Sequence, residues 1–437
     1  MMNFPQSVKE KLTELISNMA ANPELFIKNP ETDFTRNRKL SFETVMHFML
    51  SMGGNSLPDE IMEYFDYNAN AASSSAFIQQ RDKILPFAFE YILDKFTNSF
   101  QDLKTYQGYR LFAVDGSVLN ICHNPKDADT YFRTKPNVKG FNQLHLNAMY
   151  DLCNKLYIDV SIQKGRKSNE YRALTDMTDR SNISDNVIVV ADRGYESYNV
   201  FAHIEKKGWK YAIRVKDISS NGILSGLKLP NTDEFDVTIS RILTRKQTKE
   251  TRSNPELYKF LPSTGTFDYL DQHINKFYPI TFRVVRFKIS DDAYETIITN
   301  LDSEQFPPDK IKELYQLRWG IETSFRELKY ALGLTCFHAK KVESITQEIF
   351  ARLIMYNFCE LITMHVVIQQ KETKHSYQVN FTRAIQVCRY YFRCPSYISP
   401  PDVEALIRKN ILPIRSGRKA PRKVRGKAVI SFLYRVA

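Results

Sequence analysis

The spacing of apolar residues changes along the chain, and this change separates helical regions from strands. From Gln6 to Met19 apolar side chains recur at helical spacing, which predicts an amphipathic helix. Ser41, followed by Glu43, is a suitable N-cap for a second helix. The first hundred residues are therefore predicted to be helical. Further helices are predicted over residues 57–65, 75–96, 344–368 and 402–409.

Two hypotheses fit the predicted helices over residues 57–65 and 75–96. They form either a helix-turn-helix unit that reads the major groove of DNA or part of a plain helical bundle. In the first case, polar residues near the start of the second helix would face the groove. These residues are Ser75, Gln79, Gln80 and Arg81.

The pattern becomes extended after Tyr109. Strands are predicted over residues 109–121, 141–152, 155–163, 185–192 and 210–216, and helices over 169–180 and 197–208. Three strands, a helix, a strand, a helix and a strand form the order of a ribonuclease-H-like α/β domain. In such a sheet the first and fourth strands are neighbours, so their carboxyl ends bring Asp115 and Asp192 together.

The fold class predicted for the chain is α/β, with a ribonuclease-H-like core that a mostly β insertion interrupts. Within the insertion, strands are predicted over residues 233–243, 278–289 and 293–301. The predicted domains are a helical DNA-binding domain (1–105), the first part of the core (106–216), the insertion (217–305), the second part of the core (306–368) and a helical, basic C-terminal region (369–437).

The second part of the core contains a predicted helix from Tyr315 to Leu334 with an unusual polar face. At about 100° per residue, Tyr315, Arg318, Glu322 and Lys329 all fall within one arc of this helix. Such a face can be a solvated surface, because Arg and Glu four residues apart commonly pair. The two Asp residues of the core favour the alternative, in which Glu322 completes a site with them.

Charge and cysteine usage narrow the class of protein. Sixty-one Lys and Arg residues against 49 Asp and Glu give a net charge of +12, which indicates a polyanionic partner such as nucleic acid. The six Cys residues show no metal-binding spacing and indicate reduced thiols in the cytoplasm. The apolar stretch over residues 353–368 contains polar residues and is too short to span a bilayer, so we interpret it as a core helix.

Two Asp residues and one Glu make an all-oxygen site, which suits Mg²⁺ or Mn²⁺ rather than zinc. Two such ions, roughly 3.5–4 Å apart, can activate a water or a 3′-hydroxyl and stabilise the leaving oxygen in phosphodiester displacement. Arg318 and Lys329 would then hold phosphates. Each Asp is also followed within two residues by a glycine, as Asp-Gly and Asp-Arg-Gly, and has the alternative role of a turn former.

Three motifs together carry a resemblance to a known family. They are VDGS at Asp115, ADRGY at Asp192, and Tyr315, Arg318, Glu322 and Lys329 in the pattern Y-x₂-R-x₃-E-x₆-K. This combination resembles the insertion-sequence-four family of bacterial DDE transposases. The resemblance implies a metal triad of Asp115, Asp192 and Glu322, with DNA-end contacts from the other three residues of the third motif.

The resemblance also implies an activity and partners. The activity is cut-and-paste transposition, in which a nick at the element end is followed by a hairpin intermediate and by strand transfer. The cofactor is Mg²⁺, for which Mn²⁺ can substitute, with two ions per site. The partners are double-stranded DNA, as terminal inverted repeats and as target, and a second copy of the chain in a synaptic dimer. The protein would act in the bacterial cytoplasm at the nucleoid, with no membrane contact.

One position departs from the family pattern. Family members can stack a Trp of the insertion on a flipped base, whereas the two Trp residues here, Trp209 and Trp319, lie elsewhere. Tyr294 can offer a stacking face instead or can pack in the sheet. The remaining candidate DNA contacts are basic, and each also has the alternative role of a solvated charge: Arg193, Arg241, Arg245, Lys246, Arg418, Lys419, Arg422 and Lys423.

Two rival functions stay open at this point. One is a ribonuclease-H-like nuclease that cuts DNA without joining strands. The other is a domesticated DNA-binding protein that keeps the fold but has lost catalysis. Retention of all three carboxylates favours an enzyme.

Overall fold

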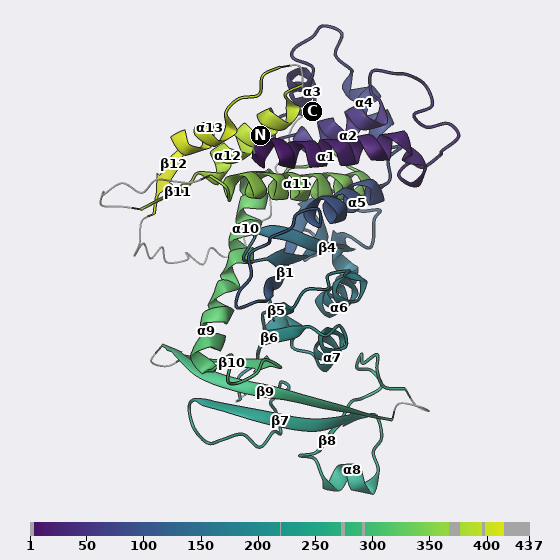
Figure 1. Ribbon diagram of the computed structural model, residues 1–437. Coiled ribbons are helices and arrows are strands. Elements are labelled where there is room, and N and C mark those ends of the chain that lie inside the picture. Colours follow the sequence, from purple (N-terminus) through teal and green to yellow (C-terminus); the bar gives the residue numbers. More distant parts are fainter. Residues whose placement is uncertain are drawn as a thin grey trace.

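The structure, a computed structural model, describes residues 4–218, 220–271, 276–290, 293–366, 376–395 and 398–414. Within these ranges the chain forms one large mixed sheet, helices on both of its faces, and a layer of helices across one end (Figure 1). The chain is therefore a mixed α/β protein, as the sequence predicts.

Five strands form the centre of the sheet: β1 (Arg110–Ile121), β3 (Phe141–Asp151), β4 (Leu156–Lys164), β5 (Val187–Ala191) and β6 (Lys210–Val215). Their spatial order is β4, β3, β1, β5, β6. β1 pairs antiparallel with β3 and parallel with β5, and β5 pairs parallel with β6. The first and fourth predicted strands of the core, β1 and β5, are therefore neighbours, and that prediction is confirmed.

The register of β1 and β5 places two acidic residues side by side. The last parallel pair is Val114 with Ala191, so the next residues along the two strands are Asp115 and Asp192. β1 does not stop there but continues to Ile121 against β3. The prediction that Asp115 lies at the carboxyl end of its strand is thus wrong, because Asp115 directly follows the parallel part of β1, six residues before the strand ends.

Helices cover the two faces of the central strands. α6 (Glu170–Arg180) and α7 (Tyr198–Lys206) lie on one face, and α9 (Pro308–Leu317) and α10 (Trp319–Tyr330) lie on the other (Figure 1). α10 packs against β1, and α9 packs against β9 (Phe277–Ser290). Together α9 and α10 run from the insertion to the helical layer.

The insertion strands extend the central sheet instead of forming a separate one. β10 (Ala293–Thr299) pairs with β6 and with β9, and β9 pairs with β7 (Phe235–Thr244). The three strands predicted in this region are therefore present. The short elements that the sequence did not predict are β2 (Tyr131–Phe132), α8 (Lys249–Ser253), β8 (Tyr258–Phe260), β11 (Tyr377–Val379), β12 (Ile411–Pro413) and the 3₁₀ turns η1 (Pro23–Leu25) and η2 (Gly165–Lys167).

The helical layer is built around α11 (Val342–Thr363), which is buried on nearly every side. The prediction of a core helix over this apolar stretch is confirmed, and no described helix is long and apolar enough to cross a membrane. Helices from both ends of the chain form one layer with α11 (Figure 1): α1 (Phe4–Ala21), α2 (Phe42–Ser51), α3 (Leu57–Tyr64), α4 (Ser74–Arg81), α5 (Pro86–Thr97), α12 (Phe381–Arg393) and α13 (Val403–Lys409). α12 lies outside the predicted helices.

The single helix predicted over residues 75–96 is wrong. α4 ends at Arg81 and α5 begins at Pro86, because proline lacks the N–H that a continuing helix needs but fits a first helical turn. Gln80 and Arg81 are buried, so only Ser75 and Gln79 of the four predicted groove-reading side chains are exposed. This burial favours the bundle over the helix-turn-helix hypothesis.

A buried ion cluster joins the N-terminal helices to α11. Arg81 Nη1 donates to Glu348 Oε1 at 2.8 Å, and Arg352 and His338 lie at 3.4 Å from the other carboxylate oxygen. Burial by itself would raise the pKa of Glu348, but the hydrogen bond from His338 and the charges of the two Arg residues outweigh it and hold that pKa well below its usual range. The cluster fixes α4 on α11.

We predict that Glu348→Gln destabilises the fold by about 3–5 kcal/mol, because it leaves two buried guanidinium groups without their counter-charge. Urea unfolding measures the loss. Glu343→Gln on the same helix is the control: Glu343 is about a third exposed, pairs with Lys28 at 2.8 Å, and should cost less than about 1 kcal/mol. Equal losses for the two variants would contradict the structural role of the cluster.

Candidate active site

Asp115 lies just after the last residue of β1 that pairs with β5, and beyond this point β1 pairs only with β3. Charged groups surround its side chain. The pKa of Asp115 is raised to about 6. Burial is the largest cause, the Gly116 N–H and the charge of Arg318 oppose the rise, and the charges of Asp192 and Glu322 add to it. Three carboxylates and one guanidinium are therefore close enough for their charges to interact. The structure brings the three predicted acidic residues together.

Local backbone geometry holds both Asp side chains. Asp115 Oδ1 accepts a hydrogen bond from the Gly116 N–H at 2.8 Å. Asp192 caps the short 3₁₀ turn η3 (Arg193–Tyr195), and its Oδ1 accepts from the Gly194 N–H at 2.7 Å. The turn-forming role that the sequence allows for Asp192 is thus real, and it leaves the second carboxylate oxygen available.

Glu322 comes from the first turn of α10. The predicted helix from Tyr315 to Leu334 is in fact two helices that meet at Arg318, where the Arg318 N–H bonds the Tyr315 carbonyl three residues back. α10 also ends at Tyr330, shortly before Gly333, whose φ is +75°. Arg318 Nη2 donates to Glu322 Oε1 at 3.0 Å, so the i,i+4 pair is present within the site.

Arg318 is a buried cation at this site, with its side chain 5% exposed. Its guanidinium carbon lies 5.6 Å from the centroid of the Tyr315 ring and 4.9 Å from that of Trp319. Tyr315 is itself buried, so the structure offers its ring to Arg318 rather than to solvent. Burial lowers the pKa of Lys329 and the charge of Asp115 opposes this, which places the half-buried ammonium near Asp115.

The other predicted DNA contacts differ in how far their side chains are exposed to solvent. Arg193 is exposed beside Asp192. Arg241 is only 4% exposed and donates to the carbonyls of Pro255 and Tyr258, so the structure does not present it to a DNA backbone.

The other predicted DNA contacts of the insertion are also partly buried or already have partners within the protein. Arg245 donates to three backbone carbonyls of the insertion, and Lys246 is half-buried. The ring of Tyr294 lies 4.1 Å from the guanidinium carbon of Arg286, which also binds Asp217. This favours the packing role of Tyr294 over stacking on a base. Arg418, Lys419, Arg422 and Lys423 lie outside the described residues.

The triad fits a divalent cation in its chemistry but is not closed around one. Carboxylate oxygens are the ligands that Mg²⁺ and Mn²⁺ prefer. Asp115, Asp192 and Glu322 each have one oxygen held by an internal donor, while the described residues give no hydrogen bond to the other oxygen. Within the same part of the chain, no three His, Cys, Asp or Glu residues are close enough to hold a metal ion together. Binding an ion would therefore have to draw these carboxylates inward.

Three residues that the sequence analysis did not single out lie beside Asp115 and Asp192: His145 on β3, Glu170 at the start of α6, and Tyr195. The sequence signal for them is the glycine found within two residues after each Asp. In the sequence analysis, Asp-Gly and Asp-Arg-Gly are connected only with the alternative role of a turn, whereas Gly116 and Gly194 also leave room for the Glu170 carboxylate.

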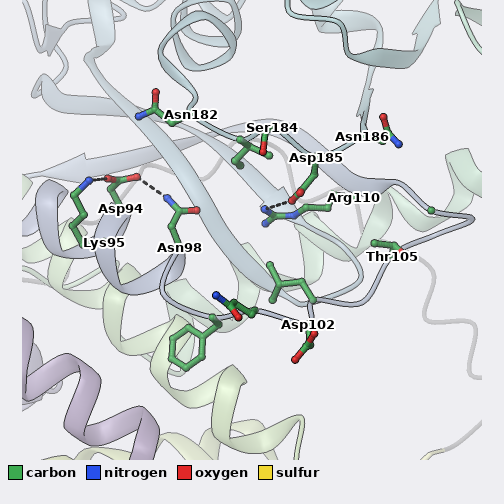
Figure 2. Close-up of a pocket in the computed structure, with 15 residues that line it drawn as sticks. Asp94, Lys95, Asn98, Asp102, Thr105, Arg110, Asn182, Ser184, Asp185 and Asn186 are labelled. Carbon is green, nitrogen blue, oxygen red and sulfur yellow. Dashed lines mark hydrogen bonds and ion pairs between the residues drawn. The ribbon is translucent and has the colours of Figure 1, made fainter.

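A separate hollow of about 810 Å³ lies near the opposite end of β1 (Figure 2). Arg110 lines it and begins β1 five residues before Asp115, a distance of about 16 Å along a strand. The cations of this hollow already have partners, since Arg110 pairs with Asp185 at 3.4 Å and Lys95 with Asp94 at 3.0 Å. The hollow therefore does not belong to the carboxylate site.

A buried network anchors α10 from behind. The Tyr356 hydroxyl lies 3.0 Å from Glu327 Oε2 on α10 and 3.4 Å from Glu360 Oε1 on α11. Tyr157, on β4, lies with its hydroxyl 2.9 Å from Ser324 Oγ of α10. The pKa of Glu360 is raised to about 7, mainly by burial, with the charge of Lys155 opposing the rise and the charge of Glu327 adding to it. The helix that carries Glu322 thus packs on a buried network that contains one carboxyl group, Glu360, with a pKa near neutral.

Comparisons with known proteins agree on one family. The family model of the transposase DDE domain matches residues 106–358, more than half of the chain. Two relatives from Escherichia coli are each 33% identical over 73 residues: the transposase of insertion sequence element IS421, and InsL, the transposase assigned to element IS186A. These matches cover 16% of this chain and span only a fifth of the relatives' length.

A solved structure of a piggyBac transposase in a synaptic complex with hairpin DNA has a TM-score of 0.46 and 11% identity to this chain, and covers 96% of this chain and 87% of that one. A likeness of this extent does not assign a function.

We predict a pH-dependent stability that Glu360→Gln removes. Because the folded pKa of about 7 exceeds the unfolded value near 4.5, the folded state binds the extra proton between these values, and stability falls as pH rises through them. Between pH 4.5 and 8 the natural protein should lose about 3 kcal/mol relative to the variant. Urea unfolding at both pH values tests this, with Glu343→Gln as a control that keeps the natural dependence. Identical profiles for the natural protein and Glu360→Gln would refute it.

Proposed function

Because the chain belongs to the transposase DDE domain family, we propose that it is a DNA transposase that cleaves the ends of its own insertion sequence and joins them to target DNA. The observation that carries this proposal is the meeting of Asp115 and Asp192 at the end of the parallel strands, opposite Glu322 and Arg318 from the α9–α10 junction. The strand order β4, β3, β1, β5, β6 supports a ribonuclease-H-like core around this site.

Asp115, Asp192 and Glu322 are the residues that would hold Mg²⁺ or Mn²⁺, two ions to a site. Such ions, when bound, supply Lewis-acid activation of a water or 3′-hydroxyl and neutralise charge on the leaving oxygen. The protein contributes the orientation of these side chains. Backbone N–H groups orient both Asp side chains, and Arg318 orients Glu322.

The cations around the triad have distinct roles in the proposal. Arg318 is too buried to leave the site, so it acts by fixing Glu322 and by offsetting the repulsion among the carboxylates. Lys329, half-buried and near Asp115, binds a phosphate oxygen of the DNA end. Arg193 is exposed beside Asp192 and binds the adjoining backbone.

The wider proposal is cut-and-paste transposition through a hairpin intermediate, in a synaptic dimer that holds two terminal inverted repeats in the cytoplasm. The net charge of +12 supports a DNA partner. The proposed domains are those predicted from the sequence: 1–105, 106–216, 217–305, 306–368 and 369–437. Residues before the core and after it share one helical layer, which we propose as the DNA-binding region together with Arg418, Lys419, Arg422 and Lys423.

We predict that Glu322→Gln leaves DNA binding intact and reduces cleavage by several orders of magnitude, because it removes the charge that holds an ion but keeps the shape. The assay uses DNA that carries the ends of the element, with Mg²⁺, on denaturing gels. Glu313→Gln is the matched control: Glu313 lies exposed on α9 and pairs with Lys310 at 2.8 Å, so its loss should leave cleavage unchanged.

Equal cleavage by the natural protein and Glu322→Gln would show that Glu322 is not a metal ligand and would contradict the assignment of the triad. Cleavage without strand-transfer products would point to a nuclease, and DNA binding without any cleavage would point to a domesticated binding protein. A hairpin band that depends on Glu322 supports the full proposal.

A further inference from the structure

A fourth carboxylate lies between the two Asp segments. Glu170 begins α6, and the backbone around it is fixed because the Asn169 side chain caps that helix. A Cβ atom added at Gly116 would lie 2.6 Å from Glu170 Oε1, and one added at Gly194 would lie 3.2 Å from Glu170 Oε2. The Glu170 carboxylate therefore occupies the space that these two glycines leave open.

The geometry of β1 determines which of the two Asp residues the Glu170 carboxylate approaches. Side chains alternate between the faces of a strand, so Gly116 faces away from Asp115 and toward the side that α6 covers. At Gly194 the same added Cβ would also lie 2.8 Å from Asp192 Oδ1. Glu170 is thus a neighbour of Asp192, on the side of the sheet opposite Glu322 and α10.

Glu170 has the same arrangement of oxygens as the triad. The ring N–H of His145 donates from Nε2 to Glu170 Oε1 at 3.0 Å, and the His145 side chain is 13% exposed. Across the described chain no hydrogen bond reaches Glu170 Oε2. Each of the four carboxylates therefore has one oxygen held by an internal donor and one oxygen left over.

A buried hydroxyl lies among these groups. Tyr195 is 1% exposed, and its hydroxyl has no hydrogen-bond partner among the described residues. Burial raises the pKa of this hydroxyl, and the charges of Glu170, Asp115 and Asp192, in that order, raise it further. An unpartnered donor is costly inside a protein, so this hydroxyl indicates a ligand or water at the same place.

Three carboxylates with three free oxygens supply few ligands for two hard cations, which take six or more oxygens each. We propose that Glu170 is a fourth carboxylate of the site and, together with Asp192, binds a second divalent cation on the α6 side of the strand end. His145 is a positioning residue that fixes Glu170. This assignment rests on the proposed function, since it gives the two ions of that function separate carboxylate sets that share Asp192.

The test counts bound Mn²⁺ by the loss of the free-ion electron paramagnetic resonance signal, with full-length protein at pH 7. The natural protein should bind two ions and Glu170→Gln one, at Mn²⁺ concentrations that saturate the natural protein. Asp176→Asn is the matched control, because Asp176 is an exposed acid of the same helix that pairs with Arg172 at 2.8 Å, and it should still bind two. His145→Ala should weaken the second ion by about 10- to 100-fold, the usual effect of losing an outer-shell partner.

Two bound ions with natural affinity in both Glu170→Gln and His145→Ala would overturn the assignment. If Glu170→Gln fails to fold by circular dichroism, the His145→Ala titration decides alone. DNA cleavage by the same samples separates the two proposals. Loss of one ion in Glu170→Gln without cleavage by the natural protein would keep the cation site and reject the transposase function. Cleavage that needs Glu322 but not Glu170, with both ions retained, would reject the cation site and keep the function.

Discussion

The parallel pairing of β1 with β5 is the constraint on which the site depends. Residues 110–114 of β1 pair with residues 187–191 of β5, and this register leaves Asp115 and Asp192 adjacent. A slip of one residue would send one of the two side chains to the other face of the sheet. The crossover through α6 makes the parallel pairing possible, and it also delivers Glu170 to the same end of the strands.

Adjacent carboxylates repel one another, and the fold carries compensating features around them. Arg318 is buried against Glu322 and near two aromatic rings, where its charge lowers the cost of keeping the acids ionised. The raised pKa of Asp115, about 6, shows that burial and the neighbouring carboxylates still disfavour its ionised form. A divalent cation would offset the repulsion among the ionised carboxylates. A cluster of acidic side chains of this kind therefore fits metal-dependent chemistry.

The position of Glu322 depends on parts of the chain far from it in sequence. α10 is held by the Tyr356 hydroxyl of α11, which bonds Glu327, and α11 is held by the ion cluster of Glu348 with Arg81 from the N-terminal helices. The insertion strands reach the same frame through β10 and β6. The helical layer, the sheet and the helices α9 and α10 are therefore packed against one another. Destabilising the layer should also disturb the geometry of the site.

The sequence by itself determined the strands of the core, their order and the adjacency of Asp115 with Asp192, because buried strands and helical periodicity are local signals and the parallel crossover allows few topologies. It also placed Glu322 with Arg318. Tertiary structure alone decided what each charge does: Arg81 and Arg241 are buried partners rather than surface contacts, the insertion extends the central sheet, and Glu170 joins the two Asp segments. These outcomes depend on which distant side chains share one space, and the spacing of residues along a chain does not encode that.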